Sequence, residues 1–248
     1  MSKRRGPGEQ AFVTRQQIID AADALARRDG LEQLSIRKLS AELSVTPAAL
    51  YWHLDNKQDL MREVIDRASA RVERPDLDEG TWLDRLLLFF ASTRQVFTEY
   101  SGITAAFVTL PPSEALQSNN LFIFQLLVEG GFDEDAAVSV FNAVTTYSLG
   151  HLMMIDTARA NRRRAGEKAF TPNAAQLRQL HADRPEFAPF MRALADFDDR
   201  KSRQQFLDGI EVLVRGAADA LSVTVPVSKR TPFAKLQGQS NASRARGR

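Results

Sequence analysis

The chain has 248 residues, with 33 basic and 31 acidic side chains and no cysteine, which excludes a disulfide framework, a thiolate metal site and a cysteine nucleophile. The first ten residues carry charge without a following apolar core, so no secretory signal is predicted. No uninterrupted apolar run approaches the length of a membrane span, and we therefore expect a soluble, cytoplasmic protein with no membrane partner.

The net charge of +2 is unevenly distributed, because both ends of the chain are basic. Cationic arms suit nucleic acids, since they gain affinity by releasing counterions. Residues 1–12 form a basic, flexible arm that leads directly into the first predicted helix, and we favour a DNA-binding role for it. Residues 224–248 form a basic tail that we expect to be disordered. For this tail, a DNA-binding role and a solubilising role are equally favoured.

The first predicted helix begins with a capping box, in which Thr14 is the N-cap and Gln17 lies three residues later. Apolar side chains then recur at helical spacing from Ile18 to Leu25, and Gly30 is expected to end the helix.

Two short helices around a tight turn follow this first helix. Ser35 is a natural N-cap for the earlier one, and Ser44 with Val45 forms the break. Thr46 then caps a second helix with Pro47 at its first position, where the missing N–H costs nothing. Two short helices joined in this way predict a helix-turn-helix, whose second helix enters the DNA major groove while the first braces it.

The exposed residues of this unit suit phosphates and base edges. Small side chains at the front allow the second helix to sit deep in the groove, and an alanine methyl suits a thymine methyl. Asn56 looks like the N-cap of a further helix, so the Lys57 ammonium and the positive end of that helix face one anion. The predicted DNA-binding residues are Arg37, Lys38, Thr46, Pro47, Ala48, Ala49, Tyr51, Trp52, His53 and Lys57.

Each of these residues also has a plainer interpretation. An isolated basic pair such as Arg37–Lys38 is usually a solvated face, and His53 alone would be an ordinary surface histidine. The burial preference of tryptophan favours a packing role for Trp52 over stacking on a base. The argument for DNA therefore depends on the caps, the turn, the small residues and the basic and aromatic flank occurring together in one short window.

Residues 11–70 resemble the DNA-binding domain of the TetR family of transcriptional regulators, especially in Leu50-Tyr51-Trp52-His53 and Asn56-Lys57. Ser44 stands where the turn of the family commonly has glycine. The resemblance implies an all-α fold, with an N-terminal three-helix helix-turn-helix domain and a larger C-terminal helical domain for ligand binding and dimerisation. It also implies a homodimeric repressor that a small molecule releases from a palindromic operator in double-stranded DNA.

A polar stretch with proline and glycine, residues 73–80, is the predicted domain boundary. We therefore expect a helix-turn-helix domain over 13–74 and a regulatory domain over 75–223. Helices are predicted for 81–100, for a short piece at 103–110, for a segment ending at Gly130 and for 134–160. A loop with one short helix is expected over 166–190, and a last amphipathic helix over 203–221.

Two of these helices, 134–160 and 203–221, are candidates for a dimer interface. The resemblance implies that the corresponding pair packs against its symmetry mate as a four-helix bundle. An apolar stripe on a helix is also explained by packing within one chain, so both explanations stay open.

The regulatory domain is rich in aromatic residues, which suits a small-molecule site with a few polar anchors. The candidate ligand-binding residues are Phe89, Thr93, Phe97, Phe107, Phe124, Asn142, Thr146 and His151. For any one of them, an ordinary core position is the commoner explanation. Tetracycline-binding members of the family hold magnesium here, but an ungapped comparison places phenyl rings at two of the positions, and these cannot coordinate it. We therefore expect no metal, no cofactor and a small, largely apolar effector.

An enzyme is disfavoured, because no zinc-binding HExxH, serine-hydrolase GxSxG or phosphate-binding glycine loop is present. The closer alternative is a DNA-binding regulator without a small-molecule ligand, which acts constitutively or through a protein partner. A cavity shared by several helices would favour ligand control, and a filled core would favour the alternative.

Overall fold

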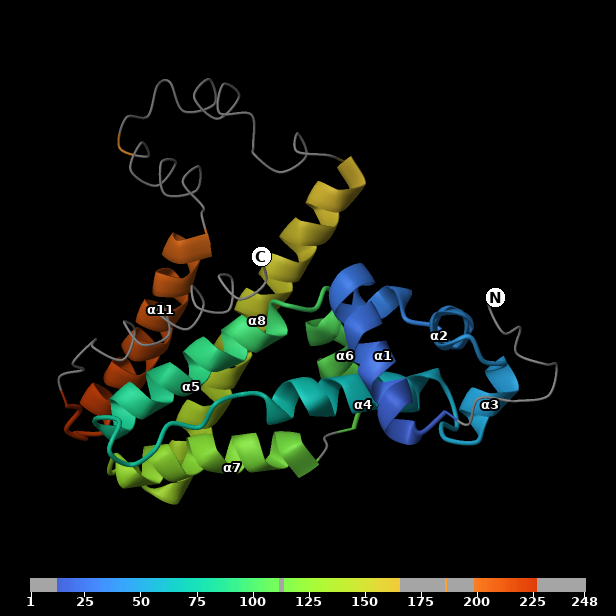
Figure 1. Ribbon diagram of the computed structural model, residues 1–248. Helices are drawn as coiled ribbons and strands as arrows, with labels where there is room; N and C mark the ends of the chain where they lie inside the picture. Colours follow the sequence, from blue (N-terminus) through green and yellow to red (C-terminus); the bar gives the residue numbers. More distant parts are fainter. Residues whose placement is uncertain (1–12, 112–113, 166–185, 187–198, 227–248) are drawn as a thin grey trace. The chain divides into compact units, whose positions relative to one another are not determined.

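The computed structural model describes residues 13–111, 114–165, 186 and 199–226, and every regular element in these ranges is helical (Figure 1). The expected all-α fold class is thereby confirmed. The chain divides into two compact units. Unit 1 consists of Met1–Arg71 and Glu99–Leu116, and unit 2 consists of Val72–Thr98 and Gln117–Arg248.

Unit 1 begins with helix α1, Arg15–Asp29, followed by a short 3-10 helix, Leu31–Gln33. The predicted capping box is present: the Thr14 hydroxyl accepts the Gln17 N–H, and the Gln17 side chain accepts the Thr14 N–H. Gly30 ends α1 with φ 95°, a conformation that side-chain-bearing residues rarely adopt.

The helix-turn-helix consists of α2, Ile36–Leu43, and α3, Pro47–Tyr51. Ser35 accepts the Lys38 N–H at 3.2 Å and Thr46 accepts the Ala49 N–H at 3.3 Å, so both predicted caps are confirmed. Ser44 occupies the turn in the left-handed conformation with φ 54°. A residue with a Cβ pays roughly 1 kcal/mol for this conformation, and the turn is formed nevertheless.

Helix α4, Lys57–Ala70, packs on α1, and Asn56 caps it by accepting the Asp59 N–H at 3.0 Å. Helix α6, Ile103–Thr109, also belongs to this unit and contacts α4. The sequence-based division kept α6 with the regulatory domain, whereas its contacts group it with the helix-turn-helix. The fully buried core of the unit includes Ile18, Ala22, Leu31, Leu39, Leu50, Leu60, Val64, Ala68, Tyr100 and Ile103.

A tight turn brings the chain into α6. Gly102 has φ 82°, and a Cβ built on it would lie 2.9 Å from the Cγ of Glu32. Leu31 donates its N–H to the Ser101 carbonyl at 2.8 Å, which fixes the turn against the end of α1. The segment from Glu99 to Gly102 is therefore built into the core of unit 1 and is not a loose connection.

Unit 2 is built around α5, Trp82–Phe97, which packs on α8, Glu134–Ala165, and α11, Asp199–Ala220 (Figure 1). Helix α7, Glu114–Glu129, precedes α8. The expectation that α5 is buried on several sides is confirmed, because nearly all of its side chains are inaccessible to solvent. Most of the predicted loop at 166–190 lies outside the described residues.

Helix α8 is unusually exposed for an apolar helix. Its segment Glu134–Thr157 has a mean hydropathy of 1.2 and is long and apolar enough to cross a membrane, although core helices of soluble proteins pass the same test. Only 28% of the tested window is buried within the chain. Much of the apolar surface of α8 is thus left uncovered by the residues that the structure describes.

Candidate DNA-binding and ligand-binding sites

The predicted DNA-binding residues form the outer surface of α2, α3 and the start of α4. Leu50 and Leu54 anchor α3 in the core, so the remaining side chains of this short helix point outward. Ala49 and His53 are half-buried. The exposed members of the set are Arg37, Lys38, Thr46, Pro47, Ala48, Tyr51, Trp52 and Lys57.

Trp52 is 88% exposed, so the packing role that residue preferences favoured is wrong. The reason is geometric: residues two positions apart on a helix point in nearly opposite directions, and Leu50 occupies the buried side. Tyr51 is also exposed, at 55%. Two large aromatic side chains therefore stand next to each other at the end of α3, which is costly unless a partner covers them.

The start of α4 has the features of an anion site. Asn56 satisfies the N–H of Asp59, and further N–H groups of the first turn point outward. The exposed Lys57 ammonium donates to the Glu32 carbonyl at 3.4 Å, which keeps it beside the helix-turn-helix. An ammonium next to a helix N-terminus suits a phosphate oxygen, as the sequence predicted.

Two arginines that sequence reasoning missed hold the helices of this surface together. Arg15 donates to the His53 carbonyl and pairs with Glu63, which ties the end of α3 to α1 and α4. Arg28 pairs with Glu42 at 3.2 Å and ties α1 to α2. No local pattern reveals these partners, because they lie 14 to 48 residues away.

The eight candidate ligand-binding residues do not share one environment. Phe89 and Phe97 are buried in α5, whereas Asn142 and Thr146 are exposed on α8. Phe107 lies on α6, in unit 1. The remaining candidates are half-buried side chains of unit 2: Thr93, Phe124 and His151.

Aromatic rings from α5, α7, α8 and α11 are in contact with one another inside unit 2. Phe206 stacks on His151 at 4.7 Å between centroids and lies edge-on to Phe90 at 6.4 Å. Phe89 contacts Phe90 at 5.6 Å and Phe122 at 5.4 Å. Among the predicted polar candidates, His151 is the one for which a ring contact in this aromatic layer is seen in the described residues.

A second polar residue, Arg94, was not predicted and lies at the same place. It is only 1% exposed, and it donates to His151 Nε2 at 3.4 Å and to Ser202 Oγ at 3.2 Å. Burial and the positive charge of Arg94 lower the pKa of His151 to about 4, so the imidazole is neutral at pH 7. No local pattern singles out Arg94, because an arginine in an apolar helix is usually interpreted as a solvated position.

Acidic and histidine side chains do not gather into a metal site in the part of the chain that the structure describes. The side chains of Phe89 and Phe107 offer no oxygen or nitrogen donor to a metal ion.

A capped helix-turn-helix with a basic and aromatic outer surface, followed by a helical domain with an aromatic interior, defines a DNA-binding transcriptional regulator. Residues 18–64 match the family model described as bacterial regulatory proteins, tetR family. Residues 74–221 match the tetracyclin repressor-like C-terminal domain. The chain therefore belongs to the TetR family, whose members are regulators and not enzymes.

Individual relatives cover most of the chain. An HTH-type transcriptional regulator of Saccharopolyspora erythraea is 29% identical over 84% of this chain and 85% of its own. The tetracycline repressor protein class D of Escherichia coli is 26% identical, over 83% and 89%. The structure of the Streptomyces coelicolor TetR family protein ActR in complex with actinorhodin has a TM-score of 0.69 at 23% identity, covering 85% and 97%. The structural likeness shows a shared fold.

Proposed function

We propose that this chain is a homodimeric repressor that a small, largely apolar molecule releases from a palindromic operator. The observation that carries the DNA-binding part is the set of exposed side chains on α2, α3 and the start of α4, which includes the aromatic Tyr51 and Trp52 and the basic Arg37, Lys38 and Lys57. Exposed aromatic rings within a basic surface suit the sugar–phosphate backbone, and the small residues at the start of α3 suit the major groove. Regulation of transcription takes place in the cytoplasm, where we expect the protein to act.

The α8 and α11 surface supports the homodimer. Met154 is 74% exposed and Val212 is 69% exposed, although both are apolar. From Val138 to Thr157 the only acidic or basic side chain besides the neutral His151 is Asp156. Homodimer interfaces are more apolar and less charged than ordinary surfaces. A two-fold axis through this surface would place the two helix-turn-helix domains, the reading heads of the dimer, on the two half-sites of a palindromic operator.

The aromatic layer supports a ligand of largely apolar character. Ligand sites in proteins are lined mainly by apolar and aromatic side chains with a few polar groups, and His151 is such a group. The ActR protein was solved in complex with actinorhodin, and we extend the binding of a small molecule to this chain only as part of the proposal. We do not propose a tetracycline–magnesium complex, because Phe89 and Phe107 cannot ligate the metal.

The proposed release mechanism is a change in the distance between the two reading heads. Helix α4 links the helix-turn-helix to the regulatory domain, and ligand binding would move it as a lever. The two α3 helices would then no longer match successive major grooves, which are about 34 Å apart.

The first experiment is a fluorescence-anisotropy titration of the purified protein on DNA from upstream of its own gene. Scrambled DNA of the same length, at the same near-physiological salt concentration, is the control. Tight binding to the native DNA alone supports a sequence-specific regulator. Equal, weak and salt-sensitive binding to both would indicate basic arms that act without sequence preference. Absence of binding to either DNA would contradict the proposal.

The same complex tests ligand control. Largely apolar aromatic compounds, with actinorhodin among them, are added to the preformed complex, and release is followed by the loss of anisotropy. A compound that binds at saturation and leaves the operator affinity unchanged would contradict the lever mechanism. Failure of every compound would favour the alternative regulator, which acts constitutively or through a protein partner.

A further inference from the structure

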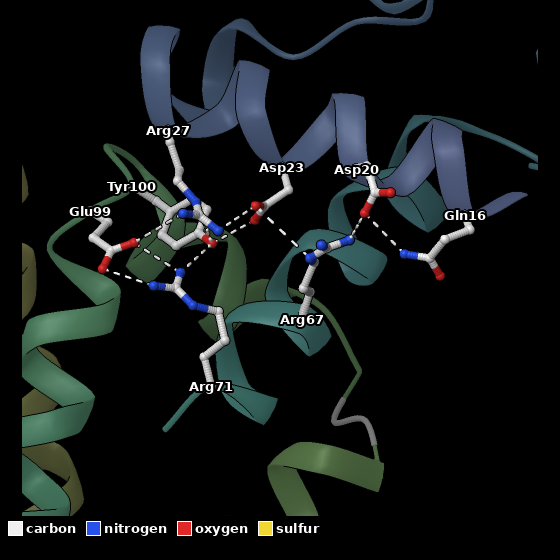
Figure 2. A network of polar contacts seen from close by, with 8 residues as sticks. All are labelled: Gln16, Asp20, Asp23, Arg27, Arg67, Arg71, Glu99 and Tyr100. Atoms are coloured by element: carbon white, nitrogen blue, oxygen red, sulfur yellow. Dashed lines mark hydrogen bonds and ion pairs between the residues drawn. The ribbon is translucent and has the colours of Figure 1, made fainter. Parts of the chain in front are cut away.

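The chain crosses between the two units at three points, and two of the crossings are joined inside unit 1. It leaves unit 1 after Arg71 and returns at Glu99, and the third crossing lies within α7. Arg71 and Glu99 form an ion pair at 2.8 Å (Figure 2). The last residue before one crossing is thus bonded to the first residue after the other, although 28 positions separate them in sequence.

The next residue, Tyr100, is the centre of the surrounding polar network. Its side chain is completely buried, and its hydroxyl donates to Asp23 at 2.6 Å. The same oxygen accepts hydrogen bonds from Arg27 at 3.2 Å and from Arg71 at 3.1 Å. We call Asp23, Arg27, Arg71, Glu99 and Tyr100 the Tyr100 cluster (Figure 2).

The electrostatics of the cluster favour this arrangement. Burial and the hydrogen bond to Asp23 raise the pKa of Tyr100, so its hydroxyl keeps the proton that it donates. The Arg27 guanidinium lies 5.5 Å from the centre of the Tyr100 ring and pairs with Asp23 at 2.5 Å. Every charge in the cluster faces an opposite charge, and the phenol fills the space between α1 and α4.

The cluster continues towards the DNA-binding surface. Arg67 of α4 lies 3.9 Å from Asp23 and pairs with Asp20, both of which belong to α1 (Figure 2). Helix α4 begins at Lys57, beside α3, and α1 begins at Arg15, which holds the end of α3. A displacement of Tyr100 therefore acts on both helices that position the recognition helix.

On the other side of the two crossings, the chain is fixed within unit 2. Arg159 of α8 donates to the Thr98 carbonyl, and the Glu73 N–H donates to the Ser92 hydroxyl of α5 at 2.8 Å. Thr98 is directly adjacent to Glu99, and a single residue separates Glu73 from Arg71. Consecutive Cα atoms are 3.8 Å apart across a trans peptide, so a short, tethered connection has little slack.

We propose that the Tyr100 cluster is the coupling element through which a change in the regulatory unit alters operator affinity, and that Tyr100 is its central positioning residue. The inference rests on the proposed function and adds a contact to α1 to the lever role of α4. When α5 or α8 shifts, the backbone at Thr98 and Glu73 moves, the Arg71–Glu99 pair is pulled, and the Tyr100 hydroxyl transmits the shift to Asp23. The helix-turn-helix then changes its position as one body.

The test uses operator DNA as the probe, because coupling between two sites is reciprocal. Hydrogen–deuterium exchange of the full-length protein is measured by mass spectrometry with and without the DNA that binds in the anisotropy titration. In the wild type, we expect DNA to change the exchange rate of amides at the end of α5 by about 3-fold or more. In Tyr100→Phe, this change should disappear while DNA affinity stays within about 10-fold.

The control variant is Thr109→Val, which also removes a hydroxyl from unit 1. Within the described residues, the Thr109 hydroxyl bonds to carbonyls of its own helix, at 3.2 and 3.1 Å, so Thr109→Val should leave the DNA-induced change intact. Glu99→Gln is the second test variant, since Glu99 is partly exposed and its amide analogue fits the same space. Glu99→Gln should also reduce the DNA-induced change in the exchange rate of the α5 amides. This variant keeps the test informative if Tyr100→Phe does not fold.

The outcomes separate the inference from the proposed function. The inference is supported if the DNA-induced change in exchange at the end of α5 (the α5 response) is lost in Tyr100→Phe or Glu99→Gln and kept in Thr109→Val. A wild type that binds DNA without any response in α5, or variants that respond like the wild type, overturns the inference and leaves the DNA-binding function standing. A wild type that binds no DNA overturns both.

Discussion

The α3 end of unit 1 and the α8–α11 surface of unit 2 both expose large apolar side chains, but they differ in the charge around them. Tyr51 and Trp52 share unit 1 with the exposed basic residues Arg37, Lys38 and Lys57. Along α8, Met154 has few charged neighbours, and on α11 Val212 lies next to charges of both signs, with Glu211 paired to Arg215. The difference teaches that exposed apolar surface alone does not identify a partner. Exposed basic residues around an apolar surface suit a polyanion, and few or mutually paired charges suit another protein surface.

The largest expected effect is that of charges placed on the α8–α11 surface. Met154→Asp combined with Val212→Asp places two charges in the proposed dimer interface, where desolvation disfavours them. We expect a monomer by sedimentation velocity and an operator affinity at least about 100-fold lower, because two linked reading heads bind by avidity. Leu77→Asp is the matched control, since Leu77 is 82% exposed outside this surface. A double variant that remains dimeric would remove the basis of the comparison.

Tyr51→Ala tests the basic surface and should have the next largest effect. We expect operator affinity to fall about 10-fold, with a similar factor for scrambled DNA, because the contact is to phosphate. Anisotropy titrations on both DNAs measure the two factors. A loss of discrimination at a single base pair would show that Tyr51 reads a base instead.

A third prediction concerns buried charged groups, whose surroundings differ between the two units. Unit 1 buries Asp23 and Tyr100 among arginines, whereas unit 2 buries Arg94 beside a neutral imidazole. The pKa of His151 is about 4 in the folded chain and near 6.5 when unfolded, so between these values the unfolded chain binds more protons. Stability should therefore be complete above pH 6.5 and fall as the pH drops towards 4.

The expected size of this effect is about 1 kcal/mol, reduced from the full shift because His151 is only partly buried. Chemical denaturation at pH 7 and pH 4.5 measures it, and the loss should be smaller in His151→Asn. His53→Asn, in unit 1, is the matched control. Equal pH dependence in the wild type and His151→Asn would show that the imidazole does not respond to its surroundings in this way.

The smallest expected effect is that of Lys57→Gln at the start of α4. One phosphate contact fewer should lower operator affinity about 3-fold at physiological salt and reduce the slope of log affinity against log salt by about 1 per reading head. Lys57→Arg should retain the slope. An unchanged slope in Lys57→Gln would place the ammonium outside the DNA interface and weaken the contrast between the two surfaces.

Local chemistry explains why the helix-turn-helix was predictable. The caps at Thr14, Ser35, Thr46 and Asn56 act within three residues, so the sequence alone reveals them, and all four are confirmed. Trp52 was misjudged because burial preference is an average over proteins, whereas its direction depends on which neighbour occupies the core.

Long-range partners explain what was missed. Arg94 meets Ser202 across 108 positions, and Tyr100 meets Asp23 across 77. No periodicity in the sequence encodes such pairs, and a buried arginine is rare enough to be taken for a surface residue. The interior of the regulatory unit was accordingly predicted as apolar with a few neutral polar anchors, and the contacts of Arg94 and Tyr100 appeared only in three dimensions.

The discontinuity of unit 1 has a consequence for synthesis on the ribosome. Residues up to Arg71 are translated before Tyr100 and Ile103, which complete the same core. At about 5–20 residues per second, the nascent helix-turn-helix waits seconds for these residues while its apolar face is uncovered. The reading head therefore matures only after part of the regulatory unit has been made, and a nascent chain that stops at the first crossing carries an unfinished DNA-binding unit.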